Sequence, residues 1–178
     1  TISGNDGSQN GINAITMIGS LTQSGDTLTL SKNPLPYLIS VMDTIVSASS
    51  TLSIESGAVI KFNGVFLRIL GSFSANGTLF TSAYDDSDGT DATGNGATVP
   101  TSGSQEVRLE SGSSSDIADA EFRYFRKALA YTSSPISLEN VVFTNNTLGI
   151  SAGAAETILK AINVTFSGNT ATSTITLP

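Results

Sequence analysis

The sequence of 178 residues contains no cysteine and no histidine. Without cysteine the chain has no disulfide, no thiolate nucleophile and no cysteine-based zinc or iron–sulfur site. Without histidine it lacks the commonest general base and metal ligand, which excludes Ser-His triads and histidine-bound zinc. Two large classes of enzymes and metalloproteins are therefore excluded before any motif is considered.

Charge is scarce as well, since only 13% of the residues are Asp, Glu, Lys or Arg. The 15 acidic residues outnumber the 8 basic ones, and the formal net charge is −7. A chain so poor in Lys and Arg is not expected to bind nucleic acid or an anionic membrane surface. No apolar run approaches the roughly 18–20 residues that span a bilayer, so we expect the protein not to be transmembrane. Thr1 opens no basic-then-apolar leader, and we expect that any export signal has already been removed.

Short bursts of alternating apolar residues, separated by clusters of Gly, Ser, Asn and Asp, run along the chain. The clearest bursts are residues 51–54, 65–70 and 72–75. Such alternation predicts strands and turns, and hence an all-β protein. Residues 11–21 carry an apolar side chain at every third position, which fits a helix only loosely and fits a strand equally well.

A repeat of about 21–23 residues is visible in both halves of the sequence. Aligning Phe122, Phe143 and Phe166 gives separations of 21 and 23 residues. Upstream, apolar residues keep separations of 22 and 21 residues, at Leu30, Leu52 and Phe73. A period of this length, with two or three short strands in each repeat, predicts a solenoid in which like residues stack above like. The leucine signature of leucine-rich repeats is missing, so a parallel β-helix fits better.

Two segments resemble a known family. Residues 51–62, TLSIESGAVIKF, are similar to the TLTIEPGVVIKF coil of secreted bacterial right-handed parallel β-helix repeat proteins, and residues 73–82, FSANGTLFTS, resemble the coil that follows it. The resemblance covers roughly residues 27–170. It implies the pectate-lyase-like solenoid fold of surface and adhesin-type proteins, a fold that also serves polysaccharide enzymes.

We therefore expect a single right-handed parallel β-helix of about six or seven coils, with about 21–23 residues per coil. It should cover residues 27–178, with one long acidic loop inserted over 84–105, while residues 1–26 form a cap or a strand donated to a neighbour. Inward-pointing side chains are expected at Leu52, Ile54, Leu67, Ile69, Phe73, Ala75, Phe122, Phe143 and Phe166. Asn146 and Asn169 fall at equivalent positions and predict a structural amide ladder.

The ends of a β-helix expose unpaired backbone groups, and two explanations are open for them: the chain is a fragment of a longer surface protein, or another copy satisfies these groups. A head-to-tail contact between copies would propagate into a filament. The interface would use the N-terminal apolar segment, the outward side chains of residues 65–70 and the last strand. The candidate interface residues are Ile12, Ile15, Ile18, Phe66, Leu70, Ile175 and Leu177.

The acidic loop is the first candidate site. Closely spaced Asp and Asn oxygens, with glycines that permit tight turns, suit a hard cation such as calcium. The spacing resembles the start of an EF-hand loop, although no Glu lies at the closing position. The alternatives are a solvated acidic insertion without a cofactor, or a calcium site whose ligands are Asp85, Asp86, Asp88, Asp91 and Asn95.

A second candidate site carries both signs of charge. Asp119, Glu121 and Arg123 alternate along one expected strand, and Arg126 lies just beyond. Carboxylates two residues apart on a strand lie roughly 6.5–7 Å apart, near the separation in inverting glycosidases. These residues predict either a catalytic site for polysaccharide cleavage or a strip of structural ion pairs.

The aromatic residues beside this charge are the third candidate. Tyr124 and Tyr131 lie close in sequence to three basic residues, and aromatic rings can stack on sugars while Arg binds uronate carboxylates. The alternative is that Phe125 belongs to the core and Tyr131 packs at a corner. Tyr124 and Tyr131 therefore predict either a carbohydrate site or ordinary packing.

Together these features predict a secreted, extracellular, non-enzymatic structural or adhesive β-helix module at the cell surface, and a subunit of a self-assembling filament. Two alternatives stay open: a polysaccharide lyase or hydrolase, and a carbohydrate-binding adhesin module. The expected partners are further copies of the chain, other cell-surface proteins or polysaccharide.

Overall fold

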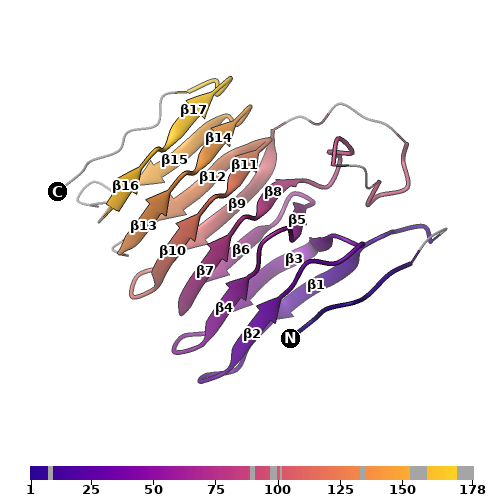
Figure 1. Ribbon diagram of the computed structural model, residues 1–178, viewed down its shortest axis with the longest axis horizontal. Coiled ribbons are helices and arrows are strands. Elements are labelled where there is room, and N and C mark those ends of the chain that lie inside the picture. The colour runs from indigo at the N-terminus through magenta and orange to yellow at the C-terminus, as the bar shows by residue number, and fades with distance from the viewer. Residues whose placement is uncertain are drawn as a thin grey trace.

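The computed structural model describes residues 1–7, 10–88, 91–96, 100, 102–132, 135–152 and 160–171. In this part of the chain every named element is a strand and every strand pairing is parallel. The strands stack as a β-solenoid of about six turns (Figure 1), which confirms the predicted fold. Within the described ranges there is no helix of the length and hydropathy needed to span a membrane.

Each turn of the solenoid contributes strands to three faces. The first face is a six-stranded sheet, which contains β2 (Thr27–Leu30), β4 (Thr51–Ile54), β7 (Ser72–Asn76), β10 (Ser114–Ala118), β13 (Ile136–Glu139) and β16 (Lys160–Ile162). The second face contains β5 (Val59–Phe62), β8 (Leu79–Ser82), β11 (Glu121–Arg123), β14 (Val142–Thr144) and β17 (Thr165–Ser167). The third face contains β6 (Phe66–Ile69), β9 (Gly103–Leu109), β12 (Phe125–Tyr131) and β15 (Leu148–Ala152).

The long strand β3 (Tyr37–Val46) belongs to the second and third faces at once, because it bends between Ile39 and Thr44. Its first part pairs with β5 and its second part with β6. The ambiguous segment 11–21 forms strand β1 (Ile15–Ser20), which pairs along both parts of β3. The apolar spacing of this segment is compatible with a helix or a strand, and its pairing with β3 makes it a strand.

The core is a stack of equivalent side chains inside the solenoid. The rings of Phe80, Phe122, Phe143 and Phe166 lie one above the next, with centroid separations of 4.4, 5.2 and 5.1 Å. Of the side chains expected to point inward, eight are buried: Leu52, Ile54, Leu67, Ile69, Phe73, Ala75, Phe122 and Phe143. Phe166 stacks on Phe143 but is 39% exposed, so the ninth expected inward side chain is not buried.

The bends between the second and third faces place one residue in the left-handed region of φ. Later turns use Tyr124, Asn145 and Gly168 there, with φ of 64°, 53° and 64°. Asn146 follows one such bend and is fully buried. Its Nδ2 donates to Phe122 O at 2.9 Å and its Oδ1 accepts from Phe125 N at 2.9 Å, so the side chain joins two turns.

Asn169 repeats this arrangement one turn later, donating to Phe143 O at 2.8 Å and accepting from Asn146 N at 2.9 Å. The structural role expected for these two residues is confirmed, but their side chains bind backbone groups, that of Asn146 included, and form no amide ladder with each other. The side-chain ladder lies at the bend between the first and second faces. There Asn163 donates to Asn140 at 2.9 Å, and Asn140 donates to Asp119 at 2.8 Å.

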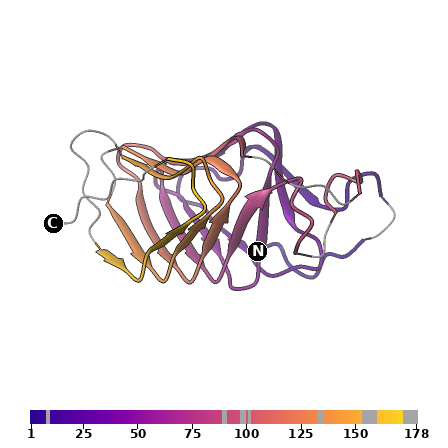
Figure 2. The same cartoon turned by 90° about the horizontal axis from the view of Figure 1, so that it is seen from above.

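The acidic loop leaves the solenoid after β8 and returns at β9, which begins at Gly103, inside the segment expected to be loop. It therefore emerges at the bend between the second and third faces. Figures 1 and 2 place its described turn beside the N-terminal segment, at one side of the stack. The two segments approach each other at Gly94, where a Cβ atom would lie 2.7 Å from Gly11 O.

Candidate functional site

The first part of the acidic loop folds back onto the second face. Lys61 and Thr81 lie side by side on β5 and β8, and Arg123 continues the same outward file on β11. The carboxylate of Asp85 is buried over this file. It accepts hydrogen bonds from Thr81 Oγ1 at 2.5 Å, from Ser87 Oγ at 2.7 Å and from Arg123 Nε at 2.6 Å.

These contacts set the ionisation of Asp85. Burial raises the pKa of this carboxyl, but the hydrogen bonds from Ser87 and Thr81 and the charge of Arg123 outweigh burial and lower the pKa below its usual value. Asp85 therefore carries its negative charge at neutral pH and holds the loop to β8 and β11.

Lys61 is the second anchor, and its side chain is fully buried beneath the loop. Its ammonium donates to the backbone oxygen of Asp85 and lies 3.2 Å from Asp88 Oδ1. A buried ammonium is tolerated only where opposite charge and hydrogen-bond acceptors surround it. Two of the five candidate calcium ligands, Asp85 and Asp88, are thus paired with basic side chains of the solenoid.

The second part of the loop is a separate unit. Asp91 accepts backbone N–H groups from Thr93, Gly94 and Gly96 at 3.2, 2.7 and 2.9 Å, and the Thr93 hydroxyl donates to Asn95. The N–H of Gly96 is the largest of the contacts that lower the pKa of Asp91. Asp91 thus closes a turn of its own loop.

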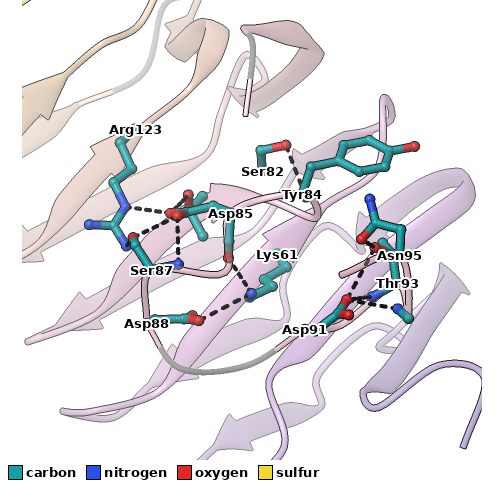
Figure 3. A network of polar contacts seen from close by, with 12 residues as sticks. Lys61, Ser82, Tyr84, Asp85, Ser87, Asp88, Asp91, Thr93, Asn95 and Arg123 are labelled. Carbon is teal, nitrogen blue, oxygen red and sulfur yellow. Dashed lines mark hydrogen bonds and ion pairs between the residues drawn. The ribbon is translucent and has the colours of Figure 1, made fainter. Parts of the chain in front are cut away.

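Figure 3 shows these two units apart: Asp85, Ser87 and Asp88 lie with Lys61 and Arg123, whereas Asp91, Thr93 and Asn95 lie near Tyr84. Both carboxylate oxygens of Asp86 are buried and accept no hydrogen bond. In the described ranges no three acidic side chains converge in a way that could hold a metal ion. The five residues do not form one ligand shell in this arrangement, and calcium binding stays a prediction.

The four candidate catalytic residues are distributed over two faces and a bend. Asp119 lies at the bend between β10 and β11, with a φ of 50°, and accepts a hydrogen bond from Asn140. It therefore does not continue the in-and-out alternation that places Glu121 and Arg123 on one side of β11. Glu121 and Arg123 do share one side of β11, 3.8 Å apart, but the Nε of Arg123 binds Asp85. Arg126 lies on the third face.

Arg126 leads to an ion-pair group that the sequence reasoning missed. Glu106 is fully buried on β9, and its carboxylate pairs with Arg126 at 2.5 Å and with Arg108 at 2.7 Å. The guanidinium of Arg108 also lies over the ring of Phe66, 4.5 Å from its centroid. The 20 residues that separate Glu106 from Arg126 are close to one coil length, a spacing that could have revealed this pair.

The candidate aromatic platform is not formed as expected. Tyr131 is only 2% exposed and belongs to the core, so its ring cannot stack on a ligand from solvent. Phe125 is fully buried, as its interpretation as a core residue requires. Tyr124 is half-buried at a bend, with a φ of 64°.

The candidate interface residues divide into three groups. Ile12 and Ile18 are exposed, whereas Ile15 packs against the core. Phe66 and Leu70 are half-buried, and Phe66 is covered by Arg108 of the same chain. Ile175 and Leu177 lie outside the described residues.

Comparisons with protein-family models, with curated proteins and with solved structures found no match. The class of protein, a parallel β-solenoid, is therefore defined by the strand pairing itself.

Proposed function

We propose that this chain is an extracellular, non-enzymatic β-helix module with a structural and adhesive role. The observation that carries the proposal is that several of its charged side chains join neighbouring turns to one another or to the loop. Arg123 binds Asp85 of the loop, Arg126 binds Glu106 one turn away, and Lys160 binds Glu139 on the paired strand of the preceding turn. Residues that a polysaccharide enzyme would use as acid, base or cation are thus occupied in holding the solenoid together.

The extracellular assignment is supported by the low share of charged residues, by the richness in Ser, Thr and Asn, and by the resemblance of residues 51–82 to secreted repeat proteins. Stacked repeats of this kind create extended surfaces that proteins use for binding, which suits an adhesive module.

The enzyme alternative is tested on a panel of neutral and acidic polysaccharides, by assaying new reducing ends and unsaturated products. We expect no product above the buffer control. Product that disappears in Glu121→Gln, whose carboxylate has the longest of the ion pairs at 3.8 Å, would overturn the proposal. Asp116→Asn is the matched control, because Asp116 is an exposed acid on the first face.

Self-association is a second part of the proposal, supported by one specific observation. Ile162 on β16 and Phe166 on β17 are large apolar side chains of one turn that are 43% and 39% exposed, and such exposed apolar groups mark contacts with partners. We propose that a second copy of the chain covers them. Negative-stain electron microscopy, with calcium and with chelator, should show fibres that Phe166→Asp abolishes and Met42→Asp preserves, because Met42 is an exposed apolar residue outside the candidate interface. Dispersed particles in every condition would refute self-association, and fibres lost only on chelation would instead support a metal in the acidic loop.

A further inference from the structure

Large apolar side chains that face solvent gather in one groove. Of the seven that are exposed in the described ranges, three line the same groove, which has a volume of about 590 Å³: Ile12 at 53%, Val41 at 77% and Tyr84 at 43% exposure. Single apolar side chains are ordinary on a protein surface, but a group of them in a concave site marks a ligand groove. The volume falls within the range that small-molecule sites occupy.

Three segments that lie far apart in the sequence build this groove. Ile12 comes from the N-terminal segment, Val41 and Val65 from the bends of the first turns, and Tyr84 and Asn95 from the acidic loop. The turn closed by Asp91 holds the loop side of the groove. The two walls contact each other at Gly94.

That contact requires glycine for two reasons. Gly94 has a φ of +69°, and a Cβ there would lie 2.7 Å from the backbone oxygen of Gly11. The loop and the N-terminal segment are thus packed backbone to backbone. This packing, together with the bonds of Asp91, means that the groove exists before any ligand binds.

Val41 carries backbone strain that packing does not explain. Its φ is 73°, in the left-handed region that a β-branched residue rarely adopts. The equivalent bend of the next turn, two residues beyond the pair Ile39 and Phe62, uses Gly64. A strained apolar side chain that is mostly exposed gains little from burial, and strain of this kind is typical of ligand sites.

The chemistry of the lining indicates the ligand. None of the described residues that line the groove is Asp, Glu, Lys or Arg, although the chain has a net charge of −7. The amides of Asn63 and Asn95 both donate and accept hydrogen bonds, as sugar hydroxyls do. The ring of Tyr84 offers a flat apolar face beside them, which can pack against the C–H face of a pyranose.

We propose that this groove binds a neutral oligosaccharide, with Tyr84 as the stacking residue and Asn63 and Asn95 as its hydrogen-bonding residues. The assignment rests on the adhesive function proposed above and gives that function a ligand class and a site. It places carbohydrate recognition at the N-terminal end of the solenoid, away from the buried Tyr131.

The test is a titration of the full chain with neutral oligosaccharides and with an acidic one, followed by backbone and side-chain amide shifts in NMR. We expect neutral ligands to shift Asn63 and Asn95 and the acidic ligand to leave them unchanged. Tyr84→Ala should weaken binding about tenfold, as expected for loss of one stacking contact. Tyr124→Ala, the half-buried tyrosine outside the groove, is the control and should bind as the wild type does.

Val41→Gly separates a binding role from a structural one. Glycine adopts positive φ without strain, so this variant should keep or raise the melting temperature while it weakens binding. A lower melting temperature with unchanged affinity would assign Val41 to the fold alone and would count against the groove.

The possible outcomes separate failure of the groove assignment from failure of the proposed function. If no neutral oligosaccharide shifts the groove residues, or if Tyr84→Ala binds as tightly as the wild type, the groove assignment is overturned while the adhesive module stands. Shortened oligosaccharides in the sample would overturn the non-enzymatic function itself.

Discussion

Asn146→Ala tests the bonds that join successive turns. The side chain is fully buried and makes two hydrogen bonds to the turn before it, to Phe122 O and from Phe125 N. Alanine removes both bonds from backbone groups of the fully buried residues Phe122 and Phe125, where water does not replace them. Each such loss costs about 1–3 kcal/mol, so the variant should lose about 2–6 kcal/mol of unfolding free energy. That is a large part of the stability of a domain of this size, which is about 5–15 kcal/mol.

Asn169→Ala is the matched control. Asn169 makes the same pair of bonds one turn later, but it is half-buried, so water can replace the lost side chain. We expect it to cost about 1 kcal/mol. Both variants are compared with the wild type by urea unfolding followed by circular dichroism, using the midpoint and the slope. Equal losses in the two variants, or a loss below about 1 kcal/mol for Asn146→Ala, would refute the reasoning.

Three further changes test the core and the loop anchors. Phe143→Ala removes a fully buried ring from the middle of the phenylalanine stack and should cost about 3–5 kcal/mol in the same urea assay, whereas a loss below about 1 kcal/mol would refute the stack. Lys61→Met removes a buried ammonium from beside Asp88 and should cost about 3 kcal/mol, and unchanged stability would mean that the pair does not anchor the loop. The lowered pKa of Asp85 means that its ionised form stabilises the fold above pH about 4 and that this contribution is lost as the pH falls through the lowered value. The melting temperature of the wild type should therefore fall more steeply below pH about 4 than that of Asp85→Asn, and parallel curves would contradict the assignment.

The stacking could be predicted from the sequence because every turn repeats the same inward position. Phe122, Phe143 and Phe166 align in sequence and lie in register in the sheet. Strand pairing in a solenoid joins neighbouring turns, so a period of about one coil is enough to fix which residues meet.

The charged contacts could not be predicted in the same way. Asp85 and Arg123 are 38 residues apart, and their meeting depends on how the loop folds back over β8 and β11. Asp119 was misplaced for a local reason, because its left-handed φ turns the chain at a bend and breaks the alternation counted along the strand. The groove depends on contact between the loop and the N-terminal segment at Gly94 and Gly11, which no spacing in the sequence reveals.

The central claim is that this solenoid adheres to its ligand and does not cleave it. The most direct measurement is retention under flow of beads coated with the full chain on surfaces coated with neutral glycans, followed by mass spectrometry of the coating. The account predicts beads that are retained by the wild type and released by Tyr84→Ala, with the glycan chains recovered at their original length. Wild-type beads that are not retained, or recovery of shortened glycan chains, would contradict the claim, whereas equal retention by Tyr84→Ala would overturn only the groove assignment.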